Sequence, residues 1–204
     1  MTRPTVVKLG GSFAFLPMLP AWLGAIARAA GEVVLVPGGG PFADAVRAAE
    51  PRMGFGDRAA HAMALLAMSQ YGIALAGLGR DFVVAENRRE IELAMAAARV
   101  PVWSPAAMLR DAADVPQSWA VTSDSLALWL ARAIEAAQVL LVKPRAAPPG
   151  ATVPSLVADG LLDPAFPDFL ARYAGTVFLA GPEDVPAAGL QPSRLPGTCI
   201  RALA

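Results

Sequence analysis

The sequence predicts an α/β fold, a three-layer αβα sandwich with a mainly parallel central sheet. Short, wholly apolar segments such as Val33–Val36 and Val139–Val142 have the character of strands buried on both faces. Segments of helical composition alternate with these strands, as in a parallel sheet covered by helices. Glycines follow the first two strands, at Gly10 and Gly38. Because ligands bind at the carboxyl ends of strands in such sheets, we expect the functional site there.

Eight segments are rich in β-branched and other apolar residues, and turn residues bound most of them. We predict strands at residues 6–9, 33–36, 73–78, 82–85, 100–103, 139–142, 177–180 and 198–203. Pro101 has no N–H to donate to a sheet, so we expect an edge strand or a strand terminus at its position. Residues 144–154 are rich in proline, alanine and glycine, which indicates a surface loop.

Seven segments carry helix signals, at residues 21–30, 42–50, 58–71, 88–99, 105–111, 122–133 and 161–174. Gly31 ends the first helix, and Pro41 suits the first turn of the second. Asp57 is an N-cap candidate for the third helix, and we expect Gly72 to end it. Thr122 begins the sixth helix, which is strongly amphipathic.

Length and composition indicate one domain over residues 1–204, since we find no repeat and no domain boundary in the 204 residues. Although 55% of the residues are hydrophobic, no apolar run approaches the ~18–20 residues of a membrane helix, and the start does not resemble an export signal. One cysteine, Cys199, fits a reducing compartment, so we expect a cytoplasmic protein without membrane association.

Charge narrows the choice of partners. The sequence has 17 acidic and 17 basic residues, a formal net charge of +0, which argues against a nucleic-acid binder with a broad cationic face. Low net charge also means little repulsion between copies of the chain. We therefore expect apolar faces to be buried in a homo-oligomer.

Lysine is scarce in this chain. The 17 basic residues include two lysines, Lys8 and Lys143, and the other 15 are arginines. Each lysine ends an apolar strand, in Thr-Val-Val-Lys and Leu-Leu-Val-Lys. An ammonium group is costly to bury unless an anion meets it, and it is more compact than a guanidinium group. The two lysines therefore indicate a phosphate site, although strand-end lysines also extend to solvent in many proteins.

Other candidate site residues each have a purely structural explanation as well. The run Gly38-Gly39-Gly40 leads into a helix and offers N–H groups to an anion, but it matches neither the P-loop nor the dinucleotide spacing, and a tight turn would explain it. Asp124 lies at a helix start, where an acid is ordinarily a cap; close to both lysines, it would instead hold their ammonium groups. His61, the only histidine in the sequence, is either structural or a substrate contact.

Together these motifs resemble the amino acid kinase family, which includes acetylglutamate, UMP, carbamate and isopentenyl phosphate kinases. The matching stretches are Val-Val-Lys-Leu-Gly-Gly-Ser (6–12), Val-Pro-Gly-Gly-Gly-Pro-Phe-Ala (36–43), Thr-Ser-Asp-Ser-Leu-Ala (122–127) and the strand before Lys143. The stretch His-Ala-Met-Ala-Leu-Leu-Ala-Met-Ser-Gln-Tyr-Gly (61–72) is similar to small archaeal kinases that convert an aminomethylfuran-methyl phosphate to its diphosphate in methanofuran biosynthesis. Bacterial relatives would serve the analogous one-carbon pathway of methylotrophs.

The resemblance implies an amino acid kinase-like fold and transfer of the γ-phosphoryl group of ATP, with Mg²⁺, to a phosphomonoester or similar small anion such as that furan phosphate. The catalytic residues it implies are Lys8, Asp124 and Lys143. The residues it implies for the nucleotide are Lys8, Gly10, Gly11, Ser12 and Lys143, with backbone and hydroxyl groups as donors. Those for the acceptor are Gly38, Gly39, Gly40, His61 and Ser123. It implies no metal ligand on the protein itself.

One stretch departs from the family pattern. Relatives usually have an Asp-Gly-containing nucleotide loop after this strand, whereas here Lys143-Pro-Arg-Ala-Ala-Pro-Pro-Gly150 follows, and the final third of the chain is short. Two alternatives therefore stay open. Besides a kinase for the furan phosphate, the sequence is compatible with a non-catalytic kinase-fold protein that binds a ligand or partner, and with a kinase for an amino acid derivative or UMP.

Overall fold

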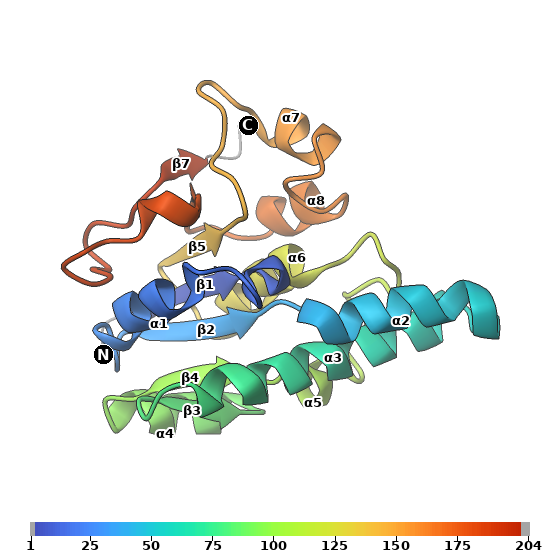
Figure 1. Cartoon of the computed structure of the whole chain (residues 1–204), viewed down its shortest axis with the longest axis horizontal. Coiled ribbons are helices and arrows are strands. Elements are labelled where there is room, and N and C mark those ends of the chain that lie inside the picture. The colour runs from blue at the N-terminus through green and yellow to red at the C-terminus, as the bar shows by residue number, and fades with distance from the viewer. Residues whose placement is uncertain (1–2, 201–204) are drawn as a thin grey trace.

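A seven-stranded sheet runs through residues 3–200, the part of the chain that the computed structural model describes (Figure 1). The strand order is β3-β4-β2-β1-β5-β6-β7, in which β7 runs antiparallel to β6 and the other pairs are parallel. The strands are β1 (Thr5–Leu9), β2 (Val33–Pro37), β3 (Phe82–Ala85), β4 (Val100–Trp103), β5 (Gln138–Val142), β6 (Thr176–Ala180) and β7 (Thr198–Ile200).

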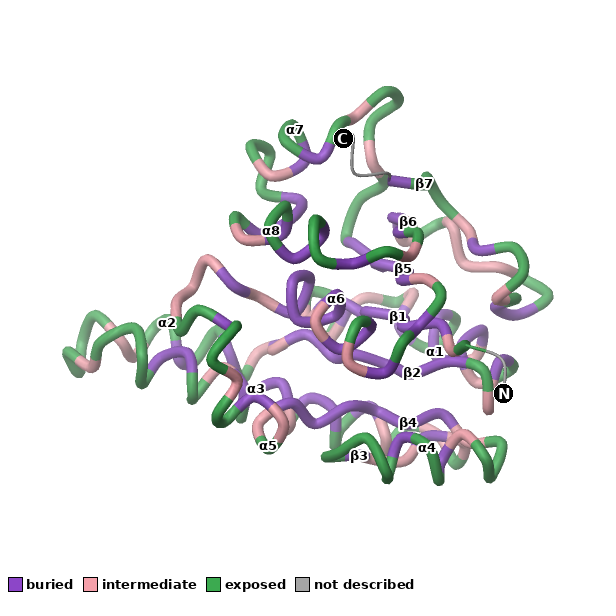
Figure 2. The backbone as a smooth tube through the Cα atoms, turned by 180° about the vertical axis from the view of Figure 1, so that it is seen from behind, coloured by how far each residue is buried: buried purple, intermediate pink, exposed green. Residues whose placement is uncertain are grey.

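Helices cover both faces of the sheet, which confirms the predicted fold class. They are α1 (Leu19–Ala27), α2 (Gly40–Met53), α3 (Asp57–Gly77), α4 (Arg88–Ala96), α5 (Pro105–Leu109), α6 (Ser123–Ala133), α7 (Val153–Ala158) and α8 (Phe166–Ala171), with two 3-10 turns at Gly11–Phe13 and Pro182–Asp184. Val6 and Leu141 belong to a core that includes residues of α6 and α8, whereas Val7 and Leu140 belong to one with residues of α1 and α3. Successive strand residues thus supply opposite cores, and buried residues follow the strands and α6 (Figure 2).

The centre of the sheet is β1, which pairs with β2 on one side and β5 on the other. Lys8 lies beside Val36 in β2 and beside Leu141 in β5. The chain order therefore reverses direction across the sheet at β1, and such a reversal opens a crevice at the carboxyl ends of the strands. This topology places the two glycine loops (Gly10–Gly11 and Gly38–Gly40) and Lys143 together at the carboxyl ends of the central strands.

Three expectations about α3 and its ends were wrong. Residues 73–78 are not a strand, because α3 continues through Gly72 as far as Gly77. Gly72 instead allows close helix–sheet packing, since a Cβ atom there would lie 3.3 Å from the Pro37 Cγ atom and 3.4 Å from the Val102 Cγ1 atom. The N-cap of α3 is Gly56 rather than Asp57, which is the first helical residue.

Pro101 does not mark an edge strand, because β4 lies between β3 and β2, but it lies beside the start of β4 as its second residue. The flanking N–H groups of Val100 and Ser104 donate to the β3 side, to the carbonyls of Asp81 and Ala85. Alternation along the strand therefore turns the missing N–H of Pro101 towards β2. In keeping with this, β2 and β4 share a single register pair.

The helices of the final third of the chain are arranged differently from the prediction. Residues 144–152 form the expected loop, but α7 follows at Val153, begun by a capping box in which Thr152 and Ser155 bond to each other's backbone N–H. The helix predicted after Pro164, within residues 161–174, is confirmed as α8. The predicted last strand is confirmed for residues 198–200, and residues 201–203 lie outside the described part.

By length and composition alone α3 would be able to cross a membrane, but 44% of its most apolar window is buried inside the protein. It packs against α2, α5 and strands β2, β3 and β4, and this core position explains its hydrophobicity. Leu66 and Ile73 nevertheless remain 55% and 61% exposed on its outer side. The expected homo-oligomer stays a prediction.

Candidate active site

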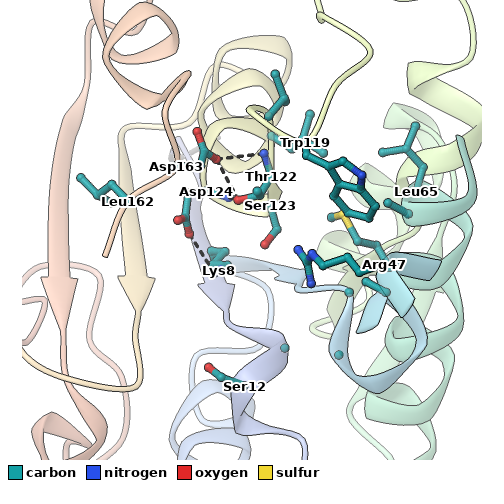
Figure 3. A pocket seen from close by; sticks show the side chains of 18 of the residues that line it. Lys8, Ser12, Arg47, Leu65, Trp119, Thr122, Ser123, Asp124, Leu162 and Asp163 are labelled. Carbon is teal, nitrogen blue, oxygen red and sulfur yellow. Dashed lines mark hydrogen bonds and ion pairs between the residues drawn. The ribbon is translucent and has the colours of Figure 1, made fainter. Parts of the chain in front are cut away.

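Both lysines of the chain meet one carboxylate. Asp124, in the first turn of α6, has its Oδ1 atom 2.8 Å from the Nζ atom of Lys8 (Figure 3). Its Oδ2 atom lies 2.6 Å from the Nζ atom of Lys143. Lys8 comes from β1, and Lys143 directly follows β5. The exposed fractions of Lys8, Asp124 and Lys143 are 5%, 3% and 8%, so these lysines do not extend to solvent.

Asp124 is not the helix cap. The N-cap of α6 is Thr122, whose hydroxyl accepts a hydrogen bond from the Asp124 N–H at 3.5 Å. The Asp124 side chain is thereby left for the two ammonium groups. The bond from Lys143 is an aligned hydrogen bond, whereas Lys8 approaches Oδ1 as an ion pair outside hydrogen-bond alignment.

Burial and charge oppose each other in this triad. Burial on its own would raise the pKa of Asp124, but the ammonium groups of Lys8 and Lys143 outweigh it and hold that pKa at about 2. Burial lowers the pKa of Lys143 to about 8, and the nearby Lys8 charge acts in the same direction against the attraction of Asp124. At neutral pH Asp124 is therefore an anion and Lys143 is largely protonated.

The two glycine loops pack backbone against backbone beside the triad. A Cβ atom on Gly11 would lie 2.2 Å from the Gly40 nitrogen, and one on Gly38 would lie 2.1 Å from the Gly11 nitrogen. No side chain fits at these positions, so they require glycine. Gly39 is the N-cap of α2 and Gly40 its first residue, with no side-chain cap, which leaves first-turn N–H groups of a 14-residue helix for an anion.

A cavity of about 490 Å³ opens between these elements. Of the predicted site residues, those that line it are Lys8, Gly11, Ser12, Gly39, Gly40, His61, Ser123, Asp124 and Lys143. Gly10 and Gly38 are not among its lining residues, and their N–H groups donate to the carbonyls of Val142 and Leu9 at 3.3 and 2.9 Å. The expectation that Gly10 donates its N–H to the nucleotide is therefore corrected. The same holds for Gly38 as an acceptor-binding residue, because its N–H already donates to Leu9 of β1.

His61 lies on α3 with an exposed fraction of 7% and lines this cavity. Burial lowers its pKa, opposed by a hydrogen bond to the backbone of Ser118, so the imidazole is neutral at pH 7. The structure thus brings His61 to the cavity wall without giving it a charge. Its contact with substrate stays a prediction.

Three further residues of the cavity wall escaped sequence analysis. Arg47 on α2 places its guanidinium carbon 4.7 Å from the ring centroid of Trp119, and the Trp119 indole N–H donates to Glu50 at 2.6 Å. Helical spacing from Gly40 was a usable signal for Arg47, which lies two turns further along the helix. Trp119 lies in an irregular loop, and Asp163 lies between α7 and α8, so neither had a local signal.

The fold and the site define a class of protein. The sequence profile of the amino acid kinase family matches residues 3–144, well over half of the chain. The chain therefore belongs to the amino acid kinase family, a family of ATP-dependent phosphotransferases, as its motifs predicted.

Individual relatives are more distant. A curated relative, the [5-(aminomethyl)furan-3-yl]methyl phosphate kinase of Methanocaldococcus jannaschii, is 28% identical over 143 residues, which cover 67% of this chain and 63% of the relative. The aligned region thus spans less than two thirds of that relative.

Solved structures support the fold alone. The uridylate kinase of Archaeoglobus fulgidus superimposes with a TM-score of 0.68 at 18% identity, over 97% of this chain and 99% of that one. The UMP kinase of Ureaplasma parvum has a TM-score of 0.67 at 13% identity, over 91% and 92% of the two chains.

Proposed function

We propose that this protein transfers the γ-phosphoryl group of ATP to a phosphomonoester or similar small anion. The observation that carries the proposal is the buried Lys8–Asp124–Lys143 triad, which faces the glycine loops within one cavity. Two ammonium groups and a helix N-terminus supply positive charge where a second phosphate approaches the first. Such charge is what phosphoryl transfer needs, since it proceeds mainly by positioning and electrostatic stabilisation.

The protonation states favour an acceptor that is already an anion. A phosphomonoester is largely a dianion at pH 7 and needs no base to lose a proton. Asp124 is a poor base here, because two ammonium groups hold its pKa at about 2. In the proposed step an acceptor phosphate oxygen bonds to the γ-phosphorus while the bond from that phosphorus to the β,γ-bridging oxygen breaks. ADP leaves with the electron pair, and Lys8 stabilises charge on the transferring group.

We propose that Mg²⁺ enters on the phosphates of ATP. Within residues 3–200 no group of three or more His, Cys, Asp or Glu side chains could hold a metal ion. Asp124 already faces two ammonium groups. Mg²⁺ at nucleotide sites is commonly held by substrate phosphates and waters with few protein ligands, which fits this cavity.

For the acceptor we propose an aminomethylfuran-methyl phosphate, the class of molecule named for the Methanocaldococcus relative. That molecule combines a phosphate, a planar aromatic ring and an ammonium group. Arg47, Trp119 and Asp44 all line the cavity and match these three parts in chemistry, as a cation, an aromatic face and a carboxylate. Arg47 pairs with Asp44 at 2.9 Å and lies over the Trp119 ring, so in this proposal the substrate replaces contacts that these side chains now make with one another. Trp119 and Arg47 lie across the cavity from Lys8 in Figure 3.

Two measurements test the proposal. Calorimetry with Mg-ATP should show saturable binding, and ADP release should follow addition of the furan phosphate. No binding heat and no turnover would favour the alternative of a non-catalytic ligand-binding or partner-binding protein. Turnover of UMP or a glutamate derivative, without turnover of the furan phosphate, would instead identify a kinase for one of those substrates.

Replacing Trp119 by leucine should raise KM for the furan phosphate about fivefold and leave KM for ATP unchanged. The expected size follows because an aromatic pair contributes about 1 kcal/mol beyond buried area, and 1.4 kcal/mol is a factor of ten. Trp119→Phe keeps a ring and serves as the matched control, with a KM near that of the wild type. An unchanged acceptor KM in Trp119→Leu would exclude stacking on this residue.

Activity should fall as the pH rises above about 8. The pKa of Lys143 is about 8 in the free protein, and above it the ammonium group that is proposed to meet the nucleotide phosphates loses its proton. The profile of kcat/KM for ATP reports the free enzyme and should show this basic limb. In Lys143→Arg the cation persists far above pH 8, so the limb should move upwards even where overall activity is lower. An identical limb in both proteins would contradict the assignment.

A further inference from the structure

Asp163 lies between α7 and α8 and is 6% exposed. Its carboxylate accepts four hydrogen bonds from the beginning of α6. The Oδ2 atom accepts from the Thr122 N–H at 3.0 Å, the Thr122 hydroxyl at 2.8 Å and the Ser125 N–H at 3.0 Å, and Oδ1 accepts from the Ser125 hydroxyl at 2.5 Å. We call these four bonds the Asp163 clamp; Figure 3 shows part of it beside Asp124.

The clamp holds the residues on both sides of Asp124. Thr122 precedes it by two positions and Ser125 follows it directly, so the backbone that carries Asp124 is fixed at two points. The carboxylate of Asp163 also sits at the N-terminus of an 11-residue helix, where negative charge is favourable. That helix end is therefore occupied by the protein's own anion rather than left for a phosphate.

A carboxylate suits this position better than an amide. An ionised aspartate offers acceptor sites only, enough for four donors, whereas an asparagine would turn its own N–H₂ group towards some of them. The four buried charges also balance, since Asp124 and Asp163 accompany Lys8 and Lys143. Removing the Asp163 charge would therefore leave the cluster with an excess of positive charge.

We propose that Asp163 is a positioning residue for phosphoryl transfer, which clamps the first turn of α6 so that Asp124 holds both ammonium groups in place. This inference rests on the proposed function. It concerns a residue outside the part of the chain that the family profile matches, which ends at residue 144. Asp163 lines the cavity wall, but it is proposed to act through Asp124 and not on the substrate.

Kinetics give the first test. Asp163→Asn should lower kcat about 100-fold with little change in either KM, because small displacements of catalytic groups have effects of this size. Asp159→Asn is the matched control, since it removes an exposed carboxylate four residues earlier in the same segment and should leave kcat unchanged. Ser125→Ala removes one of the four bonds and should lower kcat about tenfold. If Asp163→Asn does not fold, Ser125→Ala decides by the same criteria.

A second readout needs no activity. Protein labelled with ¹⁵N-lysine gives two side-chain Nζ signals, because the sequence contains two lysines. In Asp163→Asn both signals should shift and the pKa of Lys143 should fall, since the negative charge of Asp163 helps to keep Lys143 protonated. Asp159→Asn should leave both signals in place.

The outcomes separate the two proposals. Unchanged lysine signals in folded Asp163→Asn would overturn the positioning role whatever happens to kcat, and so would shifted signals with kcat within twofold of the wild type. Shifted signals with a large loss of kcat would support it. If the wild type transfers no phosphoryl group but the lysine signals still shift in Asp163→Asn, the proposed function is wrong. The effect of the clamp on the lysines would then remain valid.

Discussion

Lys8→Ala is expected to lower kcat about 100–1,000-fold while the protein stays folded, because removal of one preorganised donor at a developing charge has effects of this size. Lys8 lies 2.8 Å from Asp124 and lines the cavity, so its ammonium group is rigidly placed before any substrate arrives. Steady-state ADP release with saturating Mg-ATP measures the loss. Circular dichroism checks the fold.

Two variants make this experiment specific. Lys8→Arg keeps the charge but replaces a compact ammonium group by a planar fork, and should recover only a small part of the activity. Arg89→Ala removes an exposed cation of α4 that does not line the cavity, and should behave as the wild type. Full turnover by Lys8→Ala would remove the central role that we give to this residue.

Asp124→Asn should both abolish turnover and destabilise the fold by about 3–5 kcal/mol, the usual effect of leaving buried charges without a partner. Two ammonium groups would then face each other in a site that is almost completely buried. The measurement is the free energy of unfolding in urea at pH 7 for the wild type and for Asp124→Asn. Lys143 has a pKa of about 8 even beside Asp124, and without that anion we expect it to lose its proton more readily.

The control is the pH dependence of the difference in unfolding free energy between the wild type and Asp124→Asn. Folding lowers the pKa of Asp124 from 3.8 to about 2, so the unfolded chain binds more protons between these values and stability rises with pH there. This contribution, about 2 kcal/mol, is complete above pH 4 and is lost as the pH falls through 2. The stability gap between wild type and Asp124→Asn should narrow in the same window. A gap that does not depend on pH would show that Asp124 is not held as an anion by its neighbours.

The local parts of the fold were readable from local signals. Val33–Val36 is apolar at every position and flanked by glycines, and it forms a strand buried along its whole length. A helix begins at Gly40, directly after the glycine loop, as the pattern of strand, glycine loop and proline predicted. At Gly72 the prediction failed because of neighbours distant in sequence. Gly72 does not end its helix, because the helix packs there against Pro37 and Val102.

The site, too, has a part that the sequence predicted and a part that only the fold determines. Two scarce lysines at strand ends and an acid at a helix start are properties of the chain, and they sufficed to name Lys8, Asp124 and Lys143. That all three meet depends on β1 pairing with β5, two strands 133 residues apart in register. No local pattern encodes that pairing, since it is selected by burial of both faces of β1 within the whole sheet. The Asp163 clamp likewise depends on the assembled fold, because Asp163 lies 41 positions from Thr122 and 38 positions from Ser125 in the sequence. Short stretches of sequence thus determine the charges and the local backbone shape, whereas the distances between the charges are determined only when the sheet is assembled.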